Sequence, residues 1–134
     1  MEYISNMTSL PSYNIYNLYC PARLFFETLA NKWVLLIMNV LECSPQHFNL
    51  LKKSIEGISP KVLSQTLKNL ERDGFVKRTV IDSSPIRVEY ALTPLGTDFS
   101  KTAYLLKEWA EQNIDRVLHA QNAYDANLKK VSTS

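Results

Sequence analysis

The chain of 134 residues has little glycine, few cysteines and no long apolar run. Three glycines are too few for the turn-rich sandwiches and barrels of the all-β class. Two cysteines cannot build a disulfide framework, which favours a reducing cytoplasm. The longest apolar run, Trp33–Met38, is too short to cross a bilayer, and the N-terminus resembles no secretory signal. We therefore expect a cytoplasmic protein without a membrane partner.

Catalytic and cofactor-binding motifs are also missing. The sequence contains no GxGxxG, Walker A, HExxH or GxSxG pattern, and only two histidines. Cys43 and His47 are four residues apart, but Pro45 breaks the helix between them, and adding Cys20 gives only three metal ligands. We expect neither an enzyme nor a cofactor or metal site.

The composition indicates one globular domain with an uneven charge. The chain is 46% hydrophobic and 21% charged, which excludes disorder and low-complexity structure. The net charge is only +2, but residues 44–90 hold eight basic and five acidic side chains, and therefore all of the excess. Such a concentration is typical of a phosphate-binding surface, although ordinary solvated lysines would look the same.

Apolar residues at helical spacing predict a mainly helical fold. A short helix is expected around Asn14–Tyr19. A helix is expected to begin at Cys20-Pro21 and to be interrupted at Asn31. A second helix follows and is expected to end at Ser44-Pro45. The remaining helices are expected from Phe48 to Ile55, from Ser59-Pro60 to Gly74, and from Thr93-Pro94 to His119.

Residues typical of helix ends delimit the helix after Ser59, and a hairpin is expected to follow it. Ser59 is expected to cap it, and Pro60 suits its first turn. Gly74 ends it, and Phe75 is expected to fold back on Leu70 in a Schellman cap. The stretches Phe75–Ile81 and Ile86–Leu92 then alternate as strands around the turn Asp82–Pro85, which predicts a two-stranded hairpin.

This order of short helix, turn, helix and hairpin is that of a winged helix-turn-helix. The helix places small and amide side chains where they can reach base edges in a major groove, and longer cations where they can reach phosphates. The candidate DNA-binding residues are Ser59, Lys61, Ser64, Gln65, Lys68, Arg72, Lys77, Arg78 and Arg87. The alternatives are a solubilising face on a helical bundle, or a winged helix that only contacts proteins.

Several motifs resemble the HxlR-type branch of the MarR-like winged-helix regulators. They span about residues 20–115 in compact order: Cys20-Pro21, KWVLLI at 32–37, GISPKVLSQ at 57–65, LERDG at 70–74 and RVEYALTPLG at 87–96. The resemblance implies a dimeric bacterial transcription factor that binds double-stranded DNA at a palindromic operator. It also implies that the position of Cys20 is often a thiol sensor of oxidants or electrophiles.

The long last helix independently suggests a homodimer. It carries more apolar surface than one small domain needs. The alternative is that all of this surface is buried within one chain. The expected interface residues are Leu95, Phe99, Leu106, Trp109, Ile114 and Val117. The expected organisation is an arm (1–19), a winged helix-turn-helix domain (20–119) that includes a C-terminal dimerisation helix (94–119), and a tail (120–134) that is loose from Lys129 to Ser134.

One cysteine is expected at the N-terminus of a helix and the other at the C-terminus of the next helix. Cys20 precedes a helix, where free N–H groups and Arg23 are expected to favour a thiolate, whereas Cys43 ends one. Cys20 is therefore the candidate redox-sensing residue, responding to an oxidant or a small-molecule effector. A small buried hydrophobic residue is the competing interpretation. Mixed disulfides, alkylation and a Cys20–Cys43 link all stay open.

Overall fold

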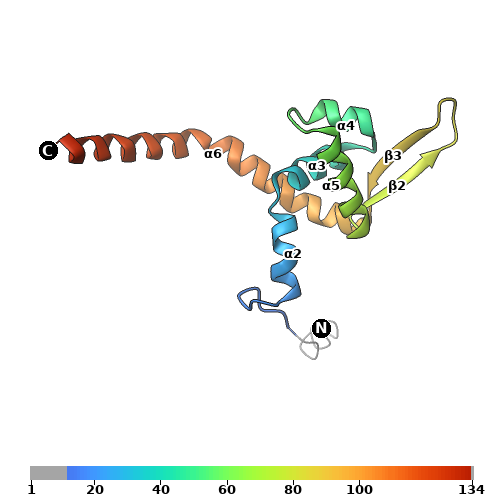
Figure 1. The fold of residues 1–134 in the computed structure, drawn as a ribbon, viewed down its shortest axis with the longest axis horizontal. Helices are drawn as coiled ribbons and strands as arrows, with labels where there is room; N and C mark the ends of the chain where they lie inside the picture. Colours follow the sequence, from blue (N-terminus) through green and yellow to red (C-terminus); the bar gives the residue numbers. More distant parts are fainter. Residues whose placement is uncertain (1–11, 134) are drawn as a thin grey trace.

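The computed structural model describes residues 12–133, and the part of the expected arm before residue 12 lies outside them. The elements in chain order are α2 (Pro21–Leu29), α3 (Lys32–Cys43), β1 (Gln46–His47), α4 (Phe48–Ser54), α5 (Pro60–Arg72), β2 (Val76–Ile81), β3 (Arg87–Leu92) and α6 (Pro94–Thr133). In Figure 1, α3, α4 and α5 form a compact body. The β2–β3 hairpin, α2 and the C-terminal part of α6 extend from this body in three directions.

Helix α3 lies at the centre of the core. The Asn31 side chain caps it by accepting hydrogen bonds from the backbone N–H groups of Trp33 (2.9 Å) and Val34 (3.2 Å). Its buried residues pack with the apolar face of α5 and with Leu51 of α4. The amide of Asn39 donates to the carbonyls of Leu35 (3.0 Å) and Ala103 (3.4 Å), which ties α3 to α6.

Three aromatic rings join segments that are distant in sequence. Phe75, at the start of the hairpin, meets Phe25 of α2 edge-on at 5.7 Å and stacks on Phe99 of α6 at 5.4 Å. Such ring pairs stabilise a fold beyond the contribution of the apolar area that they bury. This cluster therefore fixes α2 and α6 against the base of the hairpin. Phe99 is partly buried and packs against the core of its own chain, and its place in a dimer interface stays a prediction.

The first turn of α6 fits closely against Phe75. The Thr93 N–H donates to the Phe75 carbonyl (3.0 Å), and the Thr93 hydroxyl accepts from the N–H of Gly96 (3.0 Å). A Cβ atom at Gly96 would collide with the Phe75 carbonyl. Glycine is therefore required at position 96 by a close approach of two backbone segments.

The predicted fold class is confirmed: the chain is mainly helical with a small sheet, although the sheet has three strands. The order is β1-β3-β2, all antiparallel, and β1 contributes only two residues. This strand escapes prediction because neither Gln46 nor His47 has a strong β propensity.

Two other expectations are wrong. Residues 14–19 form turns rather than a short helix. Helix α6 does not end at His119 but continues to Thr133, so the tail predicted from residue 120 is helical over its described residues. The segment contains alanine, glutamine, leucine and lysine but neither glycine nor proline, so helical propensity persists after the apolar spacing weakens.

Candidate nucleic-acid interface

Helix α5 is divided sharply into a buried and an exposed face. Leu63, Leu67 and Leu70 are at most 1% exposed and anchor the helix in the core. The predicted DNA-contacting residues of the helix and its cap are all exposed: Ser59, Lys61, Ser64, Gln65, Lys68 and Arg72. Residues 61, 64, 65, 68 and 72 recur every three or four positions, so they share the face opposite the leucines. One surface of this helix is thus free for a ligand.

Both ends of α5 are set by local hydrogen bonds. The hydroxyl of Ser59 accepts from the Val62 N–H (3.1 Å), and Gly57 makes the preceding turn with a φ of 91°. At the other end, the Phe75 N–H donates to the Leu70 carbonyl (2.9 Å) and Gly74 has a φ of 84°. The predicted Schellman cap is confirmed, and hydrogen bonds fix where α5 begins and ends.

The exposed face of α5 carries an ordered pair of amides. The Gln65 side chain donates to Oδ1 of Asn69, with 3.0 Å between nitrogen and oxygen. Asn69 was not among the predicted site residues, although its position four residues after Gln65 was a usable signal. Amide side chains offer a donor and an acceptor that match the major-groove edge of adenine. The pair therefore suits base recognition, whereas Lys68 and Arg72 suit phosphate contacts.

The hairpin separates the three predicted wing cations onto two faces. In the β2–β3 register, Lys77 pairs with Ala91 and Arg87 with Ile81, so Lys77 and Arg87 share one face. Arg78 pairs with Tyr90 on the other face, which also carries the buried Val76. All three cations are exposed, but only Lys77 and Arg87 are presented together.

Helix α4 adds two cations that the predicted set omitted. Lys52 and Lys53 are exposed in its last turn, next to the turn that leads into α5. In helix-turn-helix proteins the first helix of the motif crosses the DNA backbone, so this is a suitable place for phosphate contacts. Their position in the basic middle third of the sequence was the signal.

Cys20 is the N-cap residue of α2 and is 7% exposed. Its side chain makes no capping hydrogen bond, and Arg23 donates instead to the Tyr16 carbonyl (3.1 Å). Cys43 is exposed at the far end of α3. Because α2 and α3 follow each other with a bend of 70°, their outer ends lie well beyond the roughly 7 Å that a disulfide tolerates between Cα atoms. A Cys20–Cys43 link within one chain is therefore excluded in this fold.

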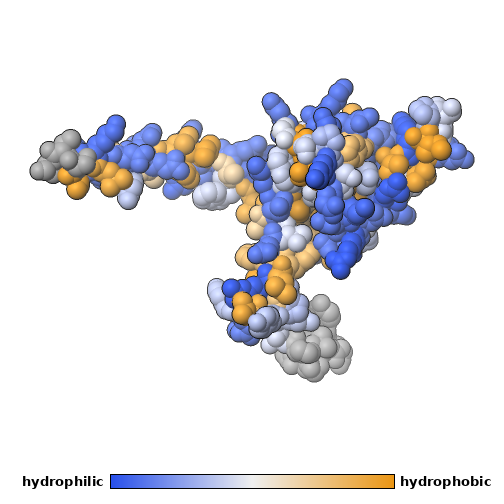
Figure 2. All heavy atoms as spheres, in the orientation of Figure 1, coloured by the Kyte–Doolittle hydropathy of each residue, from blue (hydrophilic) through white to orange (hydrophobic). Residues whose placement is uncertain are grey.

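Most of the predicted dimer residues form an exposed apolar surface on α6. Leu95, Leu106, Trp109, Ile114 and Val117 are each at least 36% exposed. Figure 2 shows apolar patches along this helix, whereas the body is mainly hydrophilic on the same face. Hydrogen bonding to the Glu111 carboxylate raises the pKa of Lys107 above its usual range, and Glu108 does the same for Tyr104. The polar side of this helix thus carries local ion pairing beside the apolar surface.

No single helix among residues 12–133 is long and apolar enough to cross a membrane; α2 and α3 reach that composition only as a bent pair. Within the same residues, no three histidine, cysteine, aspartate or glutamate side chains gather where they could hold a metal ion.

The fold and the exposed α5 define a winged helix-turn-helix protein. The family described as HxlR-like helix-turn-helix matches residues 28–118. The regulator YtfH of Escherichia coli (strain K12) is 36% identical over 118 residues, which are 88% of this chain and 94% of YtfH. This chain belongs to the HxlR-like family of transcriptional regulators.

Solved structures agree with this assignment. The transcriptional regulator ytfH from Salmonella typhimurium has a TM-score of 0.78 at 34% identity, covering 83% of this chain and 99% of that one. The redox regulator HypR in its reduced form has a TM-score of 0.66 at 30% identity, covering 75% and 98%. The protein is a transcriptional regulator and not an enzyme.

Proposed function

We propose that the protein is a dimeric regulator that reads a palindromic operator in double-stranded DNA with α5. The observation that carries the proposal is the face of α5 opposite its buried leucines, where the Gln65–Asn69 pair lies between cations. Lys77 and Arg87 extend the basic surface onto the hairpin, where a cation can follow the backbone or enter a minor groove. Two copies would present two such helices to half-sites about 34 Å apart.

The test compares two substitutions on the same face of α5. Gln65→Ala is expected to relax base preference, costing about 1–3 kcal/mol of discrimination at one position of each half-site. Lys68→Ala is expected to weaken binding to all sequences alike. It should also reduce the slope of log binding constant against log salt concentration by about one. Binding is measured on the promoter next to the gene and on scrambled DNA over a salt series.

Equal effects of the two substitutions on all sequences would contradict the assignment of reading and positioning roles. Weak binding without a palindromic protected region would favour a winged helix that only contacts proteins.

We further propose that the regulator responds to oxidants or electrophiles through Cys20. The thiol occupies the N-cap position of α2, and HypR, a structural relative, is named a redox regulator. Because the thiol is buried, modification requires the segment before α2 to shift, which would disturb α2 and the Phe25–Phe75 contact.

Diamide with an added low-molecular-weight thiol joins that thiol to Cys20 in a mixed disulfide while diamide is reduced to its hydrazine. This treatment is expected to weaken operator binding by the wild-type protein and by Cys43→Ser. Cys20→Ser is expected to bind equally well with and without diamide. Electrophoretic mobility shifts with titrated protein measure the effect, and unchanged binding by the oxidised wild-type protein would refute it.

A further inference from the structure

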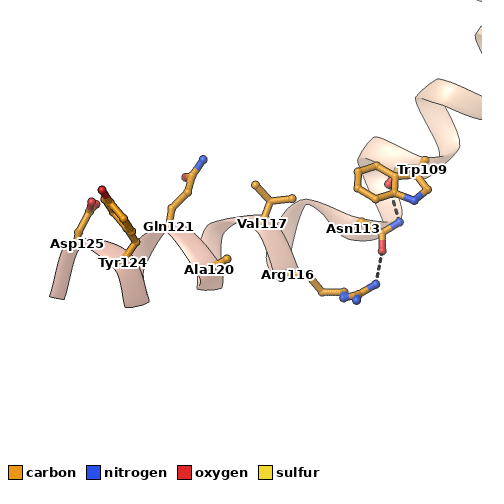
Figure 3. Close-up of a pocket in the computed structure, with 8 residues that line it drawn as sticks. All are labelled: Trp109, Asn113, Arg116, Val117, Ala120, Gln121, Tyr124 and Asp125. Atoms are coloured by element: carbon orange, nitrogen blue, oxygen red, sulfur yellow. Dashed lines mark hydrogen bonds between the residues drawn. The ribbon is translucent and has the colours of Figure 1, made fainter. Parts of the chain in front are cut away.

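Hollows in the surface of the protein differ in how many elements line them. One follows α6 from Trp109 to Asp125 and is lined by that helix alone (Figure 3). Another, with a volume of about 490 Å³, lies where α3, the end of α4 and α6 meet. We call it the α3–α6 pocket, and its lining includes Leu36, Val40, Cys43, Ile55, Glu56 and Lys107. Its volume is in the range of small-molecule sites, which occur among packed helices.

The walls of the α3–α6 pocket are mainly apolar. Leu36 and Val40 lie one turn apart on α3, and Ile55 lines the pocket from the C-cap position of α4. Leu36 remains 37% exposed although its helix lies at the centre of the core. Apolar walls with a few polar groups are the usual lining of an organic-ligand site, and the hydrophobic effect favours a ligand with an apolar body.

The charged side chains of the pocket favour a cation over an anion. The Lys107 ammonium is already paired, because it lies 2.9 Å from a carboxylate oxygen of Glu111. The Glu56 carboxylate forms no ion pair within residues 12–133, and neither Lys52 nor Lys53 of α4 lines the pocket. A carboxylate at the edge of an apolar pocket attracts positive charge, and walls of low dielectric concentrate its field.

Two further carboxylates lie beside the pocket. Glu42 precedes Cys43 on α3, and Glu108 follows Lys107 on α6. Hydrogen bonding to Glu108 and, more weakly, the charge of Glu42 raise the pKa of Tyr104 above its usual range. The negative field of these groups therefore extends over the outer side of α3 and α6. This corner is acidic although the chain as a whole carries a net charge of +2.

The pocket also borders the turn that leads into α5. Ile55 and Glu56 belong to this turn, in which the Ile58 N–H donates to the Ile55 carbonyl (3.3 Å) and Gly57 has a φ of 91°. A ligand that contacts Ile55 and Glu56 therefore touches the segment that sets where α5 begins.

We propose that the α3–α6 pocket binds an effector that is an apolar organic cation. The apolar walls hold the body of the cation, and Glu56 pairs with its charge. Its effect on DNA rests on the proposed function, because the turn beside the pocket positions the helix that is proposed to read the operator. The binding step itself does not depend on DNA.

The test uses two ions that each carry four phenyl groups but have opposite charges, tetraphenylphosphonium and tetraphenylborate. Isothermal titration of the full-length protein should give a Kd at least tenfold lower for the phosphonium. Glu56→Gln should raise that Kd at least fivefold. Glu27→Gln, which removes an exposed carboxylate on α2 outside the pocket, is the matched control and should change it less than twofold. Circular dichroism checks that both variants keep their fold.

The exposed Cys43 thiol reports where the cation binds, since it lines the pocket. Tetraphenylphosphonium should slow the alkylation of Cys43 by iodoacetamide at least threefold in the wild-type protein, as followed by mass spectrometry of its peptide. Equal Kd values for the two ions, equal effects of the two substitutions, or an unchanged alkylation rate would each overturn the inference.

Operator binding separates this result from the proposed function. Saturating tetraphenylphosphonium should change the operator Kd of the wild-type protein at least threefold. An unchanged operator Kd in a protein that binds both the cation and the operator would overturn the effector role. A protein that binds the cation in the pocket but binds no operator would refute the proposed function alone.

Discussion

The proximal half of α6 (residues 94–113) and its distal half (residues 114–133) belong to one uninterrupted helix but are stabilised in different ways. The proximal half is fixed by Asn39, by the Phe75–Phe99 stack and by the close fit of Gly96 against the Phe75 carbonyl. The apolar side chains between residues 114 and 131 of the distal half are exposed. An amphipathic pattern therefore shows that one face of a helix is suited to packing. It does not show whether that face packs against its own domain.

The largest difference is expected between two leucine truncations. Leu67→Ala leaves a cavity in the core against which the proximal half packs, and should cost about 2–5 kcal/mol of unfolding free energy. Leu128→Ala removes a half-exposed side chain in the distal half. At protein concentrations where the chain is monomeric, it should change the unfolding free energy by no more than about 0.5 kcal/mol. Urea unfolding measures both. Similar losses would show that the distal half is buried within one chain.

A smaller effect is expected at the junction of the hairpin and the proximal half. Gly96→Ala forces apart the backbone of α6 and the Phe75 carbonyl, and should cost about 1–3 kcal/mol. Thr97→Ala, one residue further along on the exposed side, is the control and should stay within about 0.5 kcal/mol. Denaturation midpoints of the two variants sharpen the comparison, and a neutral Gly96→Ala would mean that the close approach is not a fixed feature of the fold.

The elements of the winged helix were predictable because each is specified by neighbouring residues. The Ser59 cap, the Pro60 start and the Gly74 Schellman end act within a few positions of α5, and their hydrogen bonds appear as expected. The exposed stripe from Lys61 to Arg72 follows from the helical repeat alone. The exposure of the candidate residues on α5 was accordingly predictable from the sequence, whereas Asn69 was not among the candidates.

Other parts of the site depend on pairing across the fold. Lys77, Arg78 and Arg87 look equivalent in sequence, but the strand register places Arg78 with the core-facing Tyr90. Strand β1 exists only because Gln46 and His47 lie beside β3. Phe99 fits the apolar repeat of α6 as well as Leu106 does, yet one stacks on Phe75 and the other is exposed.

The amino-acid sequence by itself determined the helices α2 to α5, the caps of α5, its exposed polar face and the family, because these depend on short-range backbone hydrogen bonds and on residue spacing. Only the tertiary structure decided which apolar side chains of α6 are buried, which wing cations share a face, and that Cys20 and Cys43 lie too far apart to be joined within one chain. Those properties depend on contacts between segments distant in the chain, and the spacing of residues along one segment does not record them.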